Sequence, residues 1–263
     1  MTHFFNLLFL LIAVVLLLPA DGFTQSSTTS EKTLENRLEK ADDLHMSGEE
    51  QKSLDIYKEV LNDDGDNLNA LWNSAVLHAK IGYRKESEEE MRVHFEKAVD
   101  LAGRAVEKNP ESGHAYYAMA VATGRMTELM GPGDRIEASR EVKENIEKAS
   151  ELVPDFAPVW HLYGVWHSDV ANMSEAVKMA AGLFSGGIPD ASNEKAEEYI
   201  KKAISMDKDN ILFHLDLAKH YLKVDQPEQA RPILKEITGM EPQMKDDPGY
   251  IQEAEEMLGN IDG

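Results

Sequence analysis

The stretch WHLYGVWHSDVAN, residues 160–172, places two Trp, two His, a Tyr and an Asp within thirteen consecutive positions. Imidazole and carboxylate groups bind metal ions and transfer protons, so these residue types could form a metal or cofactor site. They could equally form the packing face of a helix, because aromatic side chains contribute most to cores and interfaces. The choice decides whether the chain is an enzyme or a surface that binds other proteins.

The spacing of the histidines argues against a metal site. His161 and His167 are six residues apart, and so are His214 and His220. Six residues of helix turn through about 600°, so the two rings of each pair point about 120° apart and cannot bind one ion. His161 could approach His114 or His214 only across neighbouring helices. No metal ion and no other cofactor is therefore predicted.

Other patterns that would indicate catalysis or calcium binding are absent. The sequence has no Cys, no Gly-rich phosphate loop, and no G-x-S-x-G or H-E-x-x-H motif. The acidic run 63–66 lacks the closing Glu of an EF-hand loop, and the run 86–90 is expected to be solvated helix surface. Residues 131–135 and 183–189 contain Gly and Pro and are expected to be loops between helices. The sequence thus predicts that the protein is not an enzyme.

The composition indicates a helical protein with an acidic surface. The chain has 263 residues, of which 42% are hydrophobic and only 7% aromatic, and its net charge is −21. Its many Ala, Glu, Lys and Leu residues favour helices over strands. So negative a protein is not expected to bind the phosphates of nucleic acids.

The N-terminal residues are predicted to lie outside the folded domain. Residues 4–18 are mostly apolar, and this run has the length of a signal-peptide core, shorter than a membrane span of about 20 residues. Residues 1–22 are predicted to be a signal peptide that is cut ahead of Phe23, or else residues 4–20 anchor the chain in a membrane. Cleavage would export the protein to the periplasm or the extracellular space. The Ser- and Thr-rich residues 23–32 are expected to be a polar tether that does not fold alone.

Residues 33–263 contain an internal repeat of about 34 residues, the length of a tetratricopeptide helix–turn–helix unit. Small residues recur where two antiparallel helices must approach closely: Ala41 and Gly48 of the first unit correspond to Ala75 and Gly82 of the second. One helix pair cannot bury its apolar face alone, so stacked units build the core. The predicted fold is an all-α, tetratricopeptide-like α-solenoid with insertions in units two to four. The units lie near residues 34–67, 68–112, 113–156, 157–210 and 211–244, with a C-terminal capping helix at 247–260.

The fourth unit and its insertion carry a resemblance to a known family. The residues concerned are Gly164, Trp166, Val170, Ala171, Asn172, Ser174, Leu183, Phe184, Pro189 and the segment 196–203, with weaker agreement over 140–164. On these residues the chain resembles the regulator of microtubule dynamics family from its second unit to its fifth. The resemblance implies a tetratricopeptide-like fold without catalytic residues. In the family's eukaryotic members it implies a link to microtubules and to organelle membranes.

The repeat also predicts a binding groove, because the first helix of each pair lines the concave side of such an array. Cations at Lys80, Arg125 and Lys223, beside the rings of Trp72 and Tyr117, could hold an acidic peptide or a C-terminal carboxylate. This pattern resembles the carboxylate clamps of some tetratricopeptide domains, although the Asn residues that complete those clamps are missing. Alternatively, the cations balance Glu and Asp on adjacent helices. The predicted groove residues are Trp72, Val76, Lys80, Tyr117, Val121, Arg125, His161, Val165, Asp169, Leu215, Lys219 and Lys223.

The stretch 160–172 is accordingly interpreted mainly as a helix interface. Trp160 and Gly164 are predicted to pack within the fourth unit, which leaves His161, Val165 and Asp169 to meet a partner.

Two functions follow from these patterns. The first is a non-catalytic, exported scaffold that binds a protein or acidic peptide in the groove and touches a membrane only through its N-terminal segment. The second is a binder of small apolar ligands, with a pocket under the insertion 173–193 lined by Met173, Met179, Leu183 and Phe184. The sequence predicts neither the partner's identity nor the oligomeric state.

Overall fold

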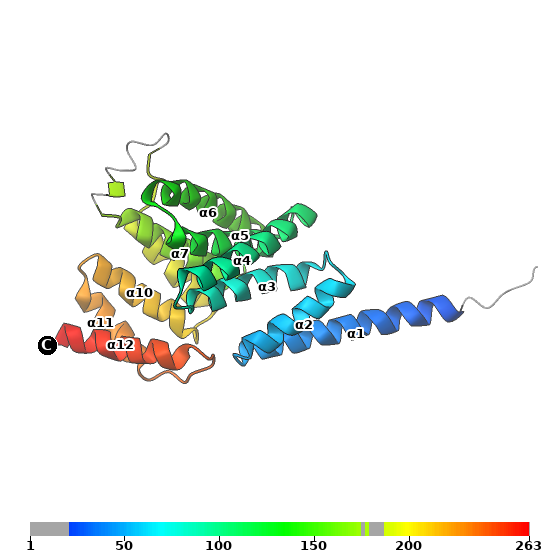
Figure 1. Cartoon of the computed structure of the whole chain (residues 1–263). Helices are drawn as coiled ribbons and strands as arrows, with labels where there is room; N and C mark the ends of the chain where they lie inside the picture. The colour runs from blue at the N-terminus through cyan, green and yellow to red at the C-terminus, as the bar shows by residue number, and fades with distance from the viewer. Residues whose placement is uncertain (1–20, 175–176, 179–186, 263) are drawn as a thin grey trace, which may run out of the picture. The chain divides into compact units, whose positions relative to one another are not determined.

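The structure, a computed structural model, describes residues 21–174, 177–178 and 187–262, and every regular element in these ranges is a helix (Figure 1). The predicted signal or anchor segment, residues 4–20, lies outside the described residues. Only the possible cleavage site ahead of Phe23 falls within them. Among the helices in the described ranges, none combines the length and apolar character that a membrane crossing requires.

The helices follow one another in pairs, as the repeat predicts. The pairs are α1 (Asp21–Met46) with α2 (Glu50–Asp63), α3 (Leu68–Tyr83) with α4 (Glu88–Lys108), α5 (Gly113–Met126) with α6 (Pro132–Leu152), α7 (Ala157–Ala171) with α9 (Asn193–Met206), and α10 (Ile211–Lys223) with α11 (Pro227–Ile237). A short 3-10 turn, η1 (Thr127–Leu129), precedes α6, and α12 (Asp247–Asp262) follows the last pair. Helices α3, α5, α7 and α10 begin at the residues where the sequence places new units. The all-α, tetratricopeptide-like fold class is confirmed.

The insertions in units two and three lengthen the second helix of each pair. Both α4 and α6 have 21 residues, whereas α2 and α9 have 14. The expectation of a loop over residues 131–135 is therefore wrong, because α6 begins at Pro132. Proline suits the first turn of a helix, where its fixed φ is already helical and no N–H is needed.

The acidic run 86–90 forms the start of α4. The Ser87 hydroxyl oxygen accepts a hydrogen bond from the Glu90 backbone N–H, and the same hydroxyl donates to the Glu90 carboxylate. Carboxylates in a first turn also complement the positive end of the helix dipole. The run is thus a helix cap, in agreement with its interpretation as helix surface.

The N-terminal part of α1 differs from the expected tether. Residues 23–32 lie within this helix, and the possible cut ahead of Phe23 falls in its first turn. Once a helix has formed, each added residue gains a hydrogen bond at little further cost, so a polar segment can extend an existing helix. The chain divides into two compact parts, residues 1–36 and Arg37–Gly263. The helix pairs from α3 onward all lie in the second part.

Small residues allow the paired helices of this part to approach closely. Ala41, Ala75 and Ala218 are completely buried. A methyl group added at Gly82 would lie only 2.7–2.9 Å from side-chain atoms of His94 and Phe95. Gly48 has a positive φ of 77° in the turn between α1 and α2, a backbone conformation that favours glycine.

Candidate functional site

The first helices of units two to five carry the predicted groove residues. All of them are half-buried or exposed except Leu215, which is completely buried. Helix α12 packs against α10 and α11, and Leu215 belongs to the apolar cluster that includes Ala254 of α12. The prediction that Leu215 lines a groove is therefore wrong, because its side chain is completely buried in this cluster with residues of α9, α11 and α12. We call the α3, α5, α7 and α10 surface that carries the remaining predicted residues the inner face.

An aromatic cluster joins α3, α5 and the start of α7 on the inner face. It consists of Trp72 of α3, His114 and Tyr117 of α5, and Phe156, which caps the start of α7. Phe156 lies at its centre, with ring centroids 4.8 Å from His114, 5.1 Å from Tyr117 and 6.2 Å from Trp72. The Trp72 and His114 centroids are 5.1 Å apart. All four residues are half-buried, so the cluster is only partly covered by the rest of the domain.

The sequence identified only two members of the aromatic cluster. Trp72 and Tyr117 occupy the fifth position of their units, whereas Phe156 lies in the turn before α7 and His114 near the start of α5. The repeat pattern assigns groove residues only to positions within helices, so it could not identify Phe156, which lies in a turn. A useful signal would have been an aromatic residue directly before a predicted helix start.

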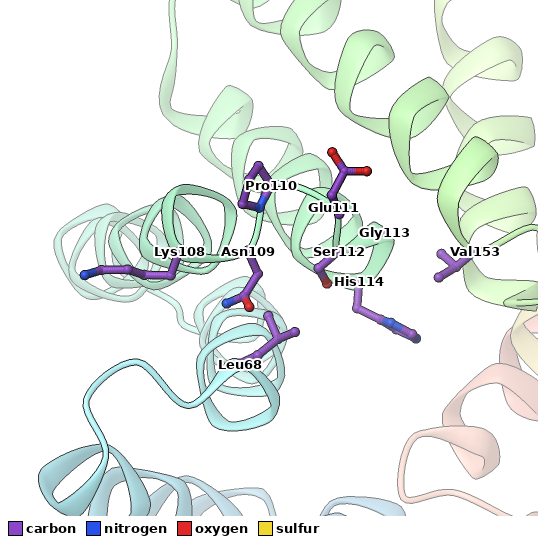
Figure 2. Close-up of a pocket in the computed structure, with 9 residues that line it drawn as sticks. All are labelled: Leu68, Lys108, Asn109, Pro110, Glu111, Ser112, Gly113, His114 and Val153. Atoms are coloured by element: carbon purple, nitrogen blue, oxygen red, sulfur yellow. The ribbon is translucent and has the colours of Figure 1, made fainter.

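A pocket of about 550 Å³ adjoins the aromatic cluster through His114. Figure 2 shows its lining around the loop that joins α4 to α5, with Leu68 and Val153 contributed by other elements. The Ser112 hydroxyl accepts a hydrogen bond from the Ala115 N–H in this loop, and Lys108 forms an ion pair with Asp66 at 3.1 Å. The residues lining the pocket are Leu68, Lys108, Asn109, Pro110, Glu111, Ser112, Gly113, His114 and Val153.

The predicted cations of the inner face all have acidic partners. Lys223 Nζ lies 2.6 Å from an oxygen of Asp169, which is itself a predicted groove residue. Lys219 pairs with Glu253 of α12 at 2.9 Å. Arg125 pairs with Glu128 at 2.9 Å, and its guanidinium lies over the exposed ring of Tyr83, 3.8 Å from the centroid. The pairs of Lys219 and Lys223 match the alternative in which cations balance acids on adjacent helices, whereas Arg125 pairs with an acid three residues along the chain.

Lys80 belongs to an ion cluster formed by Glu50, Lys80, Arg84 and Asp246. Lys80 Nζ lies 3.4 Å from Glu50 Oε1 and 3.1 Å from Asp246 Oδ2. Arg84 contacts Glu50 and donates to both Asp246 oxygens at 3.0 Å. Burial raises the pKa of Asp246, but the positive charges of Lys80 and Arg84 outweigh this and hold it below its ordinary value. The cluster contains two cations and two carboxylates.

The histidines of the stretch 160–172 and of α10 make separate structural contacts. His161 stacks on Phe213, with centroids 4.5 Å apart, and its Nε2 lies 2.9 Å from Asp216. His167 Nδ1 accepts a hydrogen bond from the Ser192 N–H, and His220 Nδ1 lies 2.9 Å from the Ser168 hydroxyl. In the part of the chain that the structure describes, no three His, Asp or Glu side chains gather in a way that could hold a metal ion.

The tryptophans of the same stretch divide between core and surface. Trp166 is 6% exposed, and its indole N–H donates to the backbone carbonyl and hydroxyl of Ser139 at 3.0 Å. Trp160 is half-buried, packs on Tyr199 and carries Lys202 Nζ 3.1 Å from the centroid of its ring. The stretch is therefore mostly a helix interface, as interpreted from the sequence, although Trp166 is its more deeply buried member.

The alternative pocket under the insertion 173–193 falls largely outside the described residues, since these exclude Met179, Leu183 and Phe184. Met173 is described, and it packs against the apolar cluster around α7. The binding of a small apolar ligand there stays a prediction.

Comparisons with known proteins agree with this architecture. A family model described as "Regulator of microtubule dynamics protein 1-3" matches residues 37–262. Regulator of microtubule dynamics protein 1 of Mus musculus is 31% identical over 236 residues, covering 87% of this chain and 75% of the relative. The Bos taurus protein of the same name is 30% identical over 233 residues, covering 86% and 71%.

Among solved structures, a thermophilic TPR protein of Thermus thermophilus is similar to this chain in fold. The TM-score is 0.61 at 17% sequence identity, and the match covers 84% of this chain and 98% of that one. This likeness confirms the tetratricopeptide-like arrangement of the helices.

Proposed function

The chain belongs to the regulator of microtubule dynamics family, and we propose that it is a non-catalytic scaffold that binds a protein or peptide on its inner face. The names of the curated relatives describe regulation of microtubule dynamics, an activity exerted on other proteins. The inner face of this chain supports one part of that activity, the binding of a protein partner.

The observation that carries this proposal is the aromatic cluster. Trp72, His114, Tyr117 and Phe156 come from α3, α5 and the start of α7, yet all four residues remain partly exposed. Large aromatic side chains at partly exposed positions supply much of the binding energy at protein interfaces. A partner side chain seated against Phe156 would lie at the junction of α3, α5 and the start of α7.

The ion pairs indicate the chemistry of the partner. Lys223 and Asp169 are exposed on the inner face, and Lys219 is about one-third exposed. A partner carboxylate can take the place of Asp169 or Glu253 beside these lysines, and this local attraction to two cations acts against the long-range repulsion from a protein of net charge −21. We therefore propose an acidic peptide segment with at least one apolar side chain for the aromatic cluster.

Site-specific photo-crosslinking tests the proposal. A benzophenone amino acid replaces Val76 or Val121, which are half-buried on the inner face, and the crosslinked partner is identified by mass spectrometry. Val93 of α4, which is 64% exposed, serves as the matched control position. We expect a defined partner from the two inner positions and none from residue 93.

The identified partner then allows a direct binding measurement. Trp72→Ala should weaken its binding at least tenfold, and Val93→Ala should leave it unchanged, at a temperature where both variants are fully folded. Equal crosslinking from residue 93, or equal affinity of the two variants, would show that the inner face is not the binding site.

A further inference from the structure

The ion cluster is completed by a residue from the other end of the repeat domain. Asp246, which directly precedes α12, binds Arg84 at the C-terminal cap of α3, although the two are 162 residues apart in the sequence. The neighbouring Lys245 also reaches the first unit, where its side chain packs over Gly48 so closely that a Cβ at residue 48 would lie 2.4 Å away. The segment between α11 and α12 therefore contacts the first and second units directly.

The backbone of this segment is held in a shape that presents Asp246. The adjacent Asp247 is buried, and its carboxylate accepts hydrogen bonds from the backbone N–H groups of Gln243 and Met244, both at 2.8 Å. Pro242 and Pro248 flank the segment and restrict its backbone. Two consecutive aspartates thus have separate roles: Asp247 shapes the turn, and Asp246 meets the cations.

The geometry around Asp246 is that of a carboxylate-binding site. Arg84 donates to both carboxylate oxygens, and Lys80 adds a third contact at 3.1 Å. Two cations on one carboxylate form strong, charge-assisted hydrogen bonds. Glu50, with only 4% of its side chain exposed, contacts both cations and neutralises one of the two positive charges. Without Asp246 the site would keep one net positive charge, so it would accept one further carboxylate.

An incoming group can reach this site from solvent. The side chains of Lys80, Arg84 and Asp246 are 29%, 33% and 20% exposed. Lys80 also lies on the same helix as Trp72 and Val76, so the site is continuous with the inner face.

We propose that Asp246 is an autoinhibitory contact, which occupies the Lys80–Arg84 site until a carboxylate of an acidic partner peptide displaces it. This proposal rests on the proposed function, because it assumes that the partner of the inner face is acidic. Displacement exchanges one carboxylate for another, so the ion cluster keeps its charge balance in both states. The tethered Asp246 has a high effective concentration, so it competes with a free peptide.

The test uses the full chain and a peptide copy of its own segment. The probe is a fluorescein-labelled peptide of residues 242–250, PQMKDDPGY, with both ends blocked, and binding is measured by fluorescence anisotropy. Asp246→Asn removes the internal competitor. Glu241→Gln removes the same charge from an exposed position of the same segment and is the matched control.

We expect the Asp246→Asn chain to bind the peptide at least tenfold more tightly than the natural chain or the Glu241→Gln chain. Adding Lys80→Glu to Asp246→Asn should abolish this gain, and a peptide that itself carries Asp246→Asn should not bind. In the natural chain, excess peptide should speed amide hydrogen exchange over residues 238–250.

Equal affinity of the Asp246→Asn and Glu241→Gln chains would overturn the autoinhibitory contact, and so would the absence of peptide binding to every chain. Neither result depends on the crosslinking from residues 76 and 121. If that crosslinking succeeds while the peptide test fails, the inner face binds a partner but Asp246 does not regulate it.

Discussion

Gly164 of α7 lies directly against Ile200 of α9, so that a Cβ at residue 164 would come within 2.5 Å of Ile200 Cγ1. The same Cβ would lie 2.9 Å from the backbone carbonyl oxygen of Ala196 and from the Ile200 nitrogen. Backbone atoms cannot move aside as a flexible side chain can. The fourth unit therefore holds its two helices together at a contact that admits only hydrogen at this position.

Gly164→Ala should for this reason lower the free energy of unfolding by about 1–3 kcal/mol, the usual cost of an overpacked core. Gly124→Ala is the matched control, because Gly124 lies inside α5 and nothing lies within 4 Å of an added Cβ. Alanine favours the helix, so this control should stabilise by up to about 1 kcal/mol. Urea denaturation measures both, and equal effects would contradict the close approach.

Trp166 and Trp160 should differ in their contribution to stability. Trp166→Ala removes a buried indole and its two hydrogen bonds to Ser139, so it should cost about 3–5 kcal/mol. Trp160→Ala loses a half-buried ring that contacts Tyr199 and Lys202, and should cost about half as much. Chemical denaturation of the two variants measures both losses of stability. A larger loss for Trp160→Ala than for Trp166→Ala would contradict the assignment of Trp166 as the more deeply buried residue.

Arg84 and Lys223 provide a comparison between ion pairs of different burial. Arg84→Met leaves the buried Glu50 with only Lys80 as a cationic partner, so it should destabilise by about 3 kcal/mol. Lys223→Met breaks an exposed pair with Asp169 and should cost less than about 1 kcal/mol. Thermal melts at low and high salt check the prediction, because screening should weaken only the exposed pair. Similar losses for both variants would argue against a buried ion cluster.

The buried histidines should make the protein sensitive to acid. Burial and, to a smaller extent, the nearby Lys195 and Lys143 lower the pKa of His167 to about 4, against the opposite effect of Asp190 and Glu147. Burial likewise lowers the pKa of His78 to about 4. In the unfolded chain a histidine has a pKa of about 6.5. Between these values the unfolded state binds more protons, so stability is lost as the pH falls from about 6.5 to about 4.

The melting temperature of the natural chain should accordingly fall between pH 7 and pH 5. His167→Gln keeps an acceptor for the Ser192 N–H but cannot be protonated, so its melting temperature should fall less over the same interval. Differential scanning fluorimetry at a series of pH values measures both curves. Parallel curves for the two proteins would show that His167 is not one of the groups responsible.

The predicted N-terminal segment has a direct test of its own. If residues 1–22 are a signal peptide, N-terminal sequencing of the exported protein should begin at Phe23. If residues 4–20 are an anchor, the intact chain should be found in the membrane fraction. A soluble chain with an intact N-terminus would contradict both alternatives.

The repeat architecture could be predicted from the sequence because its evidence is local. Ala75 and Gly82 mark a close helix approach within one unit, and the same offsets recur wherever another unit begins. Each helix pair packs mainly with its neighbours in the sequence, so a pattern of about 34 residues carries the information that determines the fold. The added lengths in units two and three were also visible, but a template of fixed length could not show that they extend α4 and α6.

The candidate site was only partly predictable because it depends on contacts between distant segments. Leu215 has the spacing of an inner-face residue, yet it is completely buried in an apolar cluster with residues of α9, α11 and α12. Phe156 lies in a turn, and the packing of successive helix pairs places it among Trp72, His114 and Tyr117.

By itself, then, the sequence determined the helix pairs, their order and which face of each helix packs against its partner, since these follow from short-range periodicity and side-chain size. Only the tertiary structure decided which charges meet. Asp246 binds Arg84 across 162 residues because each intervening unit adds its own rotation and translation, and no local pattern encodes their sum.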